Sequence, residues 1–136
     1  MQVFYKIAGG ATGYVLLLDE AAGDSLEKES GSFKGLLQKE PLAFSASQFR
    51  TPRGNAVGTF DAKWISNYAD NQTARAAVVT VNSLKLTAVH LKFVDGNSTT
   101  YIPNAIAEGY EYDRTGRSVT HTLNFEGDDL TTQEPI

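Results

Sequence analysis

The segment over residues 118–125 alternates between polar and apolar side chains. Val119, His121, Leu123 and Phe125 fall on one face, and serine, threonine and asparagine fill the positions between them. A period of two is typical of a β-strand with one buried side and one solvent-facing side. The chain must therefore supply a sheet and a second layer that covers its apolar face.

The residues before this strand predict further antiparallel strands. Residues 89–94 alternate in the same way and end at Asp95-Gly96-Asn97, a sequence typical of a tight hairpin turn. Residues 99–103 are rich in β-branched and aromatic side chains, and Pro103 is expected to mark the end of that strand. Residues 105–112 form a second arm, so 89–127 is expected to be the sheet against which the rest of the chain packs.

The N-terminal half is expected to add more strands. Residues 2–7 alternate, and the apolar run from Tyr14 to Leu18 predicts a strand buried on both faces. Residues 57–66 alternate again and carry the single tryptophan, Trp64, which we place in the core. Residues 19–40 have mixed charge and no sustained period, and they are expected to form one long loop.

One helix is predicted, over residues 71–82, with Asp70 or Asn71 as its N-cap. Its apolar positions recur at i, i+3, i+4 and i+7 and are Ala74, Ala77, Val78 and Val81. The expected fold class is therefore mainly β, an antiparallel β-sandwich with one flanking α-helix and the long loop at 19–40. Residues 1–127 are expected to form a single domain, followed by a polar, acidic tail over 128–136.

Charge and composition limit the possible partners. Sixteen acidic and 12 basic residues give a net charge of −4, which opposes binding to a nucleic-acid backbone. The chain has no cysteine, so neither disulfides nor a thiolate zinc site are expected. The longest apolar run is too short to cross a bilayer and the start of the chain does not resemble a signal peptide. We expect synthesis in a cytoplasm and no membrane insertion.

Gly23-Asp24-Ser25-Leu26 spells the signature of the GDSL esterases, which use the serine as a nucleophile. That chemistry needs a histidine to accept the serine proton and an acid to orient the histidine. In that family an aspartate lies three residues before the histidine, and neither His90 nor His121 has one there. A small hydrolase built on Ser25 is therefore a remote alternative, and we expect no enzyme.

Other candidate sites also have simpler explanations. His121 lies on an apolar face and is expected to be a hydrogen-bonded core residue, whereas His90 is expected to be exposed. The spacing of histidines and acids predicts no metal site, and we expect no cofactor. Packing across neighbouring strands explains a group of aromatic residues more simply than a sugar-binding platform does. These residues are Tyr101, Tyr110, Tyr112 and Phe125.

The elements occur in a distinctive order. A β-rich half is followed by the Trp64 strand, one helix, and a meander that contains Tyr101-Ile102-Pro103-Asn104-Ala105 and residues 119–125. This order, carried mainly by residues 57–127, resembles the small tail proteins of tailed bacteriophages, the tail tube family in particular. The resemblance implies a β-sandwich with a flanking helix that assembles into rings, often hexameric, stacked as a tube. It does not separate the tube subunit from a distal tail, terminator or other connector protein.

We therefore expect a virion structural protein, located in a phage tail, that joins copies of itself and other tail proteins around a channel. Double-stranded DNA would pass through this channel without specific binding. Edge strands, the segment 19–40 and the tail 128–136 would make the contacts. The alternative from another class is a carbohydrate- or protein-binding β-sandwich module. The residues expected at subunit interfaces are Asp24, Glu27, Lys28, Phe33, Lys34, Leu36, Leu37, Asp128 and Asp129.

Overall fold

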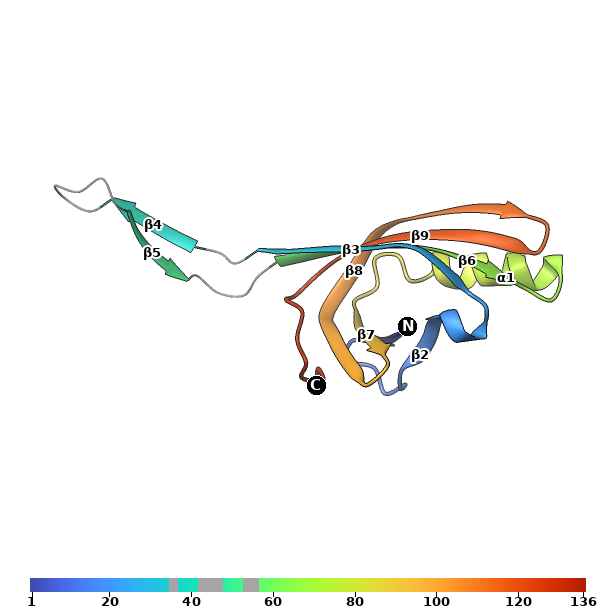
Figure 1. The fold of residues 1–136 in the computed structure, drawn as a ribbon, viewed down its shortest axis with the longest axis horizontal. Helices are drawn as coiled ribbons and strands as arrows, with labels where there is room; N and C mark the ends of the chain where they lie inside the picture. The colour runs from blue at the N-terminus through green and yellow to red at the C-terminus, as the bar shows by residue number, and fades with distance from the viewer. Residues whose placement is uncertain (35–36, 42–47, 53–56) are drawn as a thin grey trace.

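The computed structural model describes residues 1–34, 37–41, 48–52 and 57–136 (Figure 1). The strands are β1 (Gln2–Ile7), β2 (Val15–Asp19), β3 (Ser25–Lys34), β4 (Leu37–Pro41), β5 (Gln48–Pro52), β6 (Val57–Asn67), β7 (Val89–Asp95), β8 (Ser98–Thr115) and β9 (Ser118–Gly127). The described residues also form a short 3-10 helix, η1 (Glu20–Ala22), and one α-helix, α1 (Asn71–Asn82). Seven strands form one sheet in the order β2-β1-β7-β8-β9-β6-β3, and β4 pairs with β5 in a separate ribbon.

The large sheet is folded over so that its two halves face each other (Figure 1). The rings of Phe60 on β6 and Phe93 on β7 meet edge to face at a centroid distance of 4.8 Å, although two strands separate them in the sheet. Trp64 is 1% exposed in this core, as predicted. The prediction of a mainly-β, antiparallel fold with a single helix is confirmed, and the two layers of the predicted sandwich are halves of one sheet.

β8 belongs to both halves of the sheet. Residues 98–105 pair with β7, and residues 106–115 pair with β9. The register shifts opposite His90, where Pro103 and Asn104 form a bulge, and Asn104 adopts a positive φ of 52°. The prediction that Pro103 ends its strand is therefore wrong, because a bulge accepts a residue that lacks an N–H and lets the strand continue in a new direction.

The hairpin predicted at Asp95-Gly96-Asn97 forms between β7 and β8, and a second two-residue turn joins β8 to β9. Gly96 and Gly116 each take the first central position of a two-residue turn, with φ of 60° and 61°. Glycine at that position suits the turns that match the twist of paired strands. The turns fix the register that places Val119, Leu123 and Phe125 of β9 in the core.

α1 has the predicted bounds. Its N-cap is Asp70, whose carboxylate accepts a 2.7 Å hydrogen bond from the Thr73 amide. Ala74 and Val81 are buried where the helix packs against β8 and β9. No helix in the described part of the chain is both long enough and apolar enough to cross a bilayer.

The prediction of one long loop over residues 19–40 is wrong. β3 occupies residues 25–34 and pairs with β6 along its whole length, and β4 begins at Leu37. Sequence periodicity gives little sign of β3 because an edge strand needs few apolar side chains, and Leu26 and Phe33 are its only large ones. The ring of Phe33 covers Gly58 on the neighbouring strand.

The interpretation of Tyr14 to Leu18 as a strand buried on both faces is also wrong. β2 is an edge strand that pairs only with β1 in the large sheet. Leu18 is buried, but Val15 and Leu16 remain 41% and 47% exposed. An apolar run alone does not distinguish a central strand from an edge strand that keeps apolar residues on its surface.

Candidate assembly surfaces

The large sheet ends in two edge strands, β2 and β3, whose outer backbone groups have no strand partner in the described sheet. The two edges meet at one corner. There the Asp24 amide donates to the Asp19 carbonyl (3.2 Å), and the Asp24 carboxylate accepts from the Asp19 amide (2.9 Å). Beyond this corner both edges can accept a strand from another chain.

The two edges differ in chemistry. β2 presents Val15 and Leu16 to solvent, whereas β3 carries exposed polar and charged side chains between residues 27 and 32. Glu27 of β3 forms a surface ion pair with Lys63 at 3.9 Å. The predicted interface residues did not include any from the β2 edge. The apolar run over residues 14–18 was the sequence feature that could have indicated it.

The predicted interface residues are dispersed over several environments. Asp24 forms the hydrogen bonds that join the two edges at their corner. Glu27 and Lys28 are exposed on β3, and Phe33 is half-buried against the core. The backbone of Lys34 ends β3, the backbone of Leu37 begins β4, and Leu36 lies outside the described residues. β4 and β5 lie beyond the ends of β3 and β6, away from the core (Figure 1).

Asp128 and Asp129 lie in a tail that follows the surface of β8. The Asp128 amide donates to the Pro103 carbonyl (3.0 Å), and its carboxylate accepts from the Asn104 side chain (2.8 Å). Thr131 pairs with Tyr101 through backbone hydrogen bonds of 2.7 and 2.9 Å. Asp129 and Leu130 remain exposed, so this surface presents an acid beside an apolar side chain.

His121 is fully buried, as predicted, and forms the centre of a hydrogen-bonded cluster. Its Nε2 lies 2.9 Å from the hydroxyl of Tyr68, and its Nδ1 lies 2.5 Å from the hydroxyl of Tyr110. The ring stacks on Trp64 at a centroid distance of 5.0 Å. Burial lowers the pKa of His121 to about 4, because a charged ring at this site would be kept away from water, and the negative charge of Asp24 offsets only part of this cost.

In this cluster His121 is not free to act as a general base for Ser25. Both ring nitrogens of His121 have phenolic partners, so the ring cannot accept a serine proton without breaking one of these bonds. Ser25 is exposed on β3, and its cross-strand neighbour is Ile65. Across the described residues, no three histidine or acidic side chains are grouped so that they could hold a metal ion.

The second histidine is not placed as predicted. His90 is 4% exposed rather than solvent-facing, and its Nδ1 accepts from the Asn104 amide at 3.2 Å. The β8 bulge places the Asn104 amide next to the His90 ring. A surface pocket is lined by His90 together with Gln133 and Glu134 of the tail. Burial, and secondarily the charge of Lys6, lower the pKa of His90.

The aromatic residues pack mainly inside the protein. Tyr101 and Phe125 are 8% and 2% exposed, and Tyr110 is bonded to His121. Only Tyr112 of this group is strongly exposed, at 56%, and it stacks on Tyr110. Packing therefore accounts for most of the group, and its exposed member lies in a cleft beside α1.

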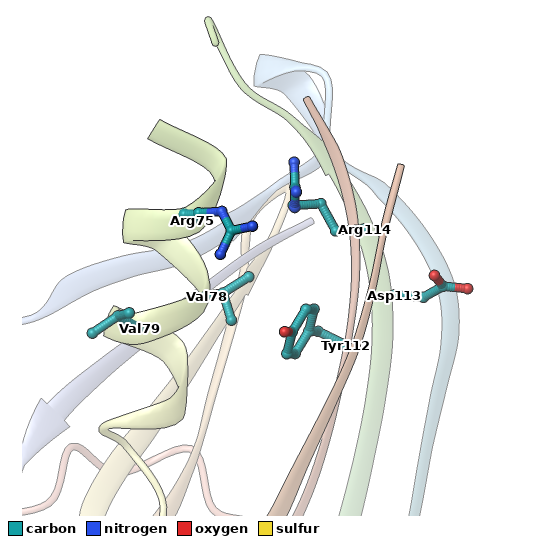
Figure 2. A pocket seen from close by; sticks show the side chains of 6 residues that line it. All are labelled: Arg75, Val78, Val79, Tyr112, Asp113 and Arg114. Atoms are coloured by element: carbon teal, nitrogen blue, oxygen red, sulfur yellow. The ribbon is translucent and has the colours of Figure 1, made fainter. Parts of the chain in front are cut away.

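This cleft, of about 510 Å³, is lined by Arg75, Val78, Val79, Tyr112, Asp113 and Arg114. In Figure 2 the side chains of Arg75 and Val78 point from α1 toward β8, and those of Tyr112 and Arg114 point from β8 toward the helix. Asp113 points away, as alternation along a strand requires. The arginine-lined cleft thus combines two cations with an aromatic ring and an aliphatic side chain.

No protein-family model matches this sequence, and no curated protein matches it. Among solved structures, a chain from the tail of an empty GTA particle with C6 symmetry is similar with a TM-score of 0.52 and 12% identity. The similarity covers 98% of this chain and 95% of that chain. A chain from the six-fold symmetrised baseplate of the anti-feeding prophage (AFP) has a TM-score of 0.48 and 11% identity, over 95% of this chain and 89% of that one. The first similarity shows that this chain shares the fold of the chain from the GTA particle tail along nearly its whole length.

Proposed function

We propose that this protein is a structural subunit of a bacteriophage tail or tail-like particle, and specifically a tail tube subunit that forms stacked hexameric rings. The observation that carries the proposal is the shared fold, which extends over 98% of this chain and 95% of a chain from a C6-symmetric tail. The proposal assigns the chain a virion location, other tail proteins as neighbours and no catalytic step.

The two open edges of the sheet provide the contacts. They are different surfaces of one molecule, so a contact between β2 of one copy and β3 of the next is heterologous and closes into a ring when the rotation permits. Val15 and Leu16 would lose solvent contact in that arrangement, which explains why a small domain keeps two large apolar residues on an edge.

The net charge of −4 fits a channel through which DNA passes without being held. Like charges repel, so an acidic wall does not bind the phosphate backbone and the polymer can move along it. This part of the proposal concerns the net charge of the subunit and assigns no individual acid to the channel wall.

Size-exclusion chromatography with light scattering and negative-stain microscopy of the full chain test the proposal. We expect a concentration-dependent assembly of six copies that appears as rings or short tubes. A compact monomer at every concentration would overturn the proposal.

A pair of matched substitutions tests the edge itself. Leu16→Lys places a charge on β2 and should weaken self-association on the order of tenfold or more, since burial of a leucine contributes at least about 1.5 kcal/mol. Leu86→Lys is the control, because Leu86 is 75% exposed outside the strands. Equal effects of the two substitutions would argue against β2 as a contact.

A further inference from the structure

The arginine-lined cleft between α1 and β8 contains two cations that are not neutralised within the described chain. Neither Arg75 nor Arg114 forms an ion pair with a described carboxylate. Arg114 is half-buried and donates to the Gly116 carbonyl at 2.8 Å, which fixes its position beside Tyr112. Asp113 is adjacent in sequence but faces the other side of the strand (Figure 2). Two uncompensated arginines on one side of an acidic protein favour an anionic partner.

The other walls of the cleft restrict the kind of anion. Val78 lies one helical turn from Arg75, and Tyr112 lies two residues from Arg114, so each wall pairs an arginine with an apolar surface. Val79 also borders the cleft, but its side chain points away from β8 and is 69% exposed (Figure 2). A peptide segment that carries carboxylates and aliphatic side chains fits this chemistry better than a bare inorganic anion does.

The tail over residues 128–136 has this composition. It contains Asp128, Asp129 and Glu134 and no lysine or arginine, and Leu130 is 46% exposed beside Asp129. Of the two acids of β3, Glu27 already pairs with Lys63. The tail can present Asp129 and Leu130 while Asp128 and Thr131 stay bonded to β8.

We propose that the arginine-lined cleft of one copy binds the acidic tail of a second copy. The cleft lies where α1 faces the ends of β8 and β9 near their turn, and the C-terminus lies on the other side of the folded body (Figure 1). The two surfaces therefore meet only between molecules. The inference rests on the self-association proposed above and adds a second contact, separate from the sheet edges.

A charge-swap experiment on the full chain tests this contact. The cleft variant Arg75→Glu/Arg114→Glu and the tail variant Asp129→Lys/Glu134→Lys should each associate at least about tenfold more weakly than wild type, because each places like charges together. A one-to-one mixture should regain association, since each cleft then faces a tail of opposite charge on the other variant. Light scattering at low and high salt measures all three samples, and circular dichroism verifies that each variant is folded.

A second pair of variants controls for net charge. Arg75→Gln/Arg114→Gln and Lys85→Gln/Arg117→Gln each remove two positive charges, but only the first pair lines the cleft. We expect only the first pair to weaken association. Folded charge-swap variants that remain dissociated when mixed, or a cleft variant that assembles like wild type, would overturn the inference.

The outcomes also separate this inference from the tube proposal. Rings that form equally well in all variants would overturn the cleft contact alone. Charge-dependent chains of copies without rings would support the cleft contact and overturn the tube. A wild-type protein that remains monomeric would overturn both.

Discussion

Acidification should destabilise this protein through His121 at pH values where most carboxylates are still ionised. The imidazole is fully buried, and its pKa of about 4 lies below the ordinary value of 6.5 that it regains on unfolding. Well above pH 6.5 the ring is neutral in both states and contributes no pH dependence. Between pH 6.5 and 4 the unfolded chain binds a proton that the folded chain does not, so stability falls as the pH falls.

The size of this effect follows from the two pKa values. The difference between 6.5 and about 4 corresponds to a loss of about 3 kcal/mol of unfolding free energy, nearly all of it present by pH 4. This loss is a large fraction of the total stability of a typical domain. The phenols of Tyr68 and Tyr110 remain protonated over this range, since burial raises the pKa of both.

Urea unfolding at pH 7.5, 6.5, 5.5 and 4.0, followed by the fluorescence of Trp64, measures this loss. Trp64 stacks on His121, so its emission reports on the site directly. His121→Gln should be less stable at neutral pH but should lose about 3 kcal/mol less than wild type on acidification to pH 4. His90→Gln controls for the other buried histidine and should keep the part of the pH dependence that His121 causes. Parallel pH profiles for wild type and His121→Gln would refute the reasoning.

Two further predictions concern packing and backbone conformation. Gly58→Ala should lower the free energy of unfolding by about 1–3 kcal/mol, because the added methyl group would collide with the ring of Phe33. Gly109→Ala is the control and should be nearly neutral, because open space surrounds that position. Denaturant midpoints measure both variants, and equal effects would show that Phe33 moves aside freely. Asn104→Ala should lose about 1 kcal/mol more unfolding free energy than Asn104→Gly, because only glycine adopts a φ of 52° without strain. Both variants lose the side-chain hydrogen bond to Asp128, so the difference between them isolates the backbone effect. Identical denaturant midpoints would mean that the bulge relaxes.

The elements that could be predicted from the sequence are those with local signals. The alternation of residues 118–125 predicted β9 and its buried face, and the Asp70 cap with the apolar spacing of 71–82 predicted the bounds of α1. In both cases the residues that determine the element lie within it, so no knowledge of distant contacts was needed.

The wrong predictions concern elements whose structure depends on contacts with distant parts of the chain. β3 is a strand because β6 supplies its hydrogen bonds, and its own polar sequence resembles a loop. His90 is buried because the bulge at Asn104 and the tail cover it, although alternation within β7 placed it on the solvent side. The cleft was missed for a similar reason, since Arg75 and Arg114 come from segments far apart in sequence and neither has a distinctive motif around it.

The shared course of β8 has a consequence for how the protein comes apart. β8 contributes hydrogen bonds to both halves of the folded sheet, so unfolding of one half also removes strand pairing from the other. We therefore expect amide hydrogens of β7 and β9 to exchange with solvent through a single common opening, at the rate of global unfolding. The molecule should have no stable half, and cutting the chain at the bulge should yield two fragments that regain structure only by recombining.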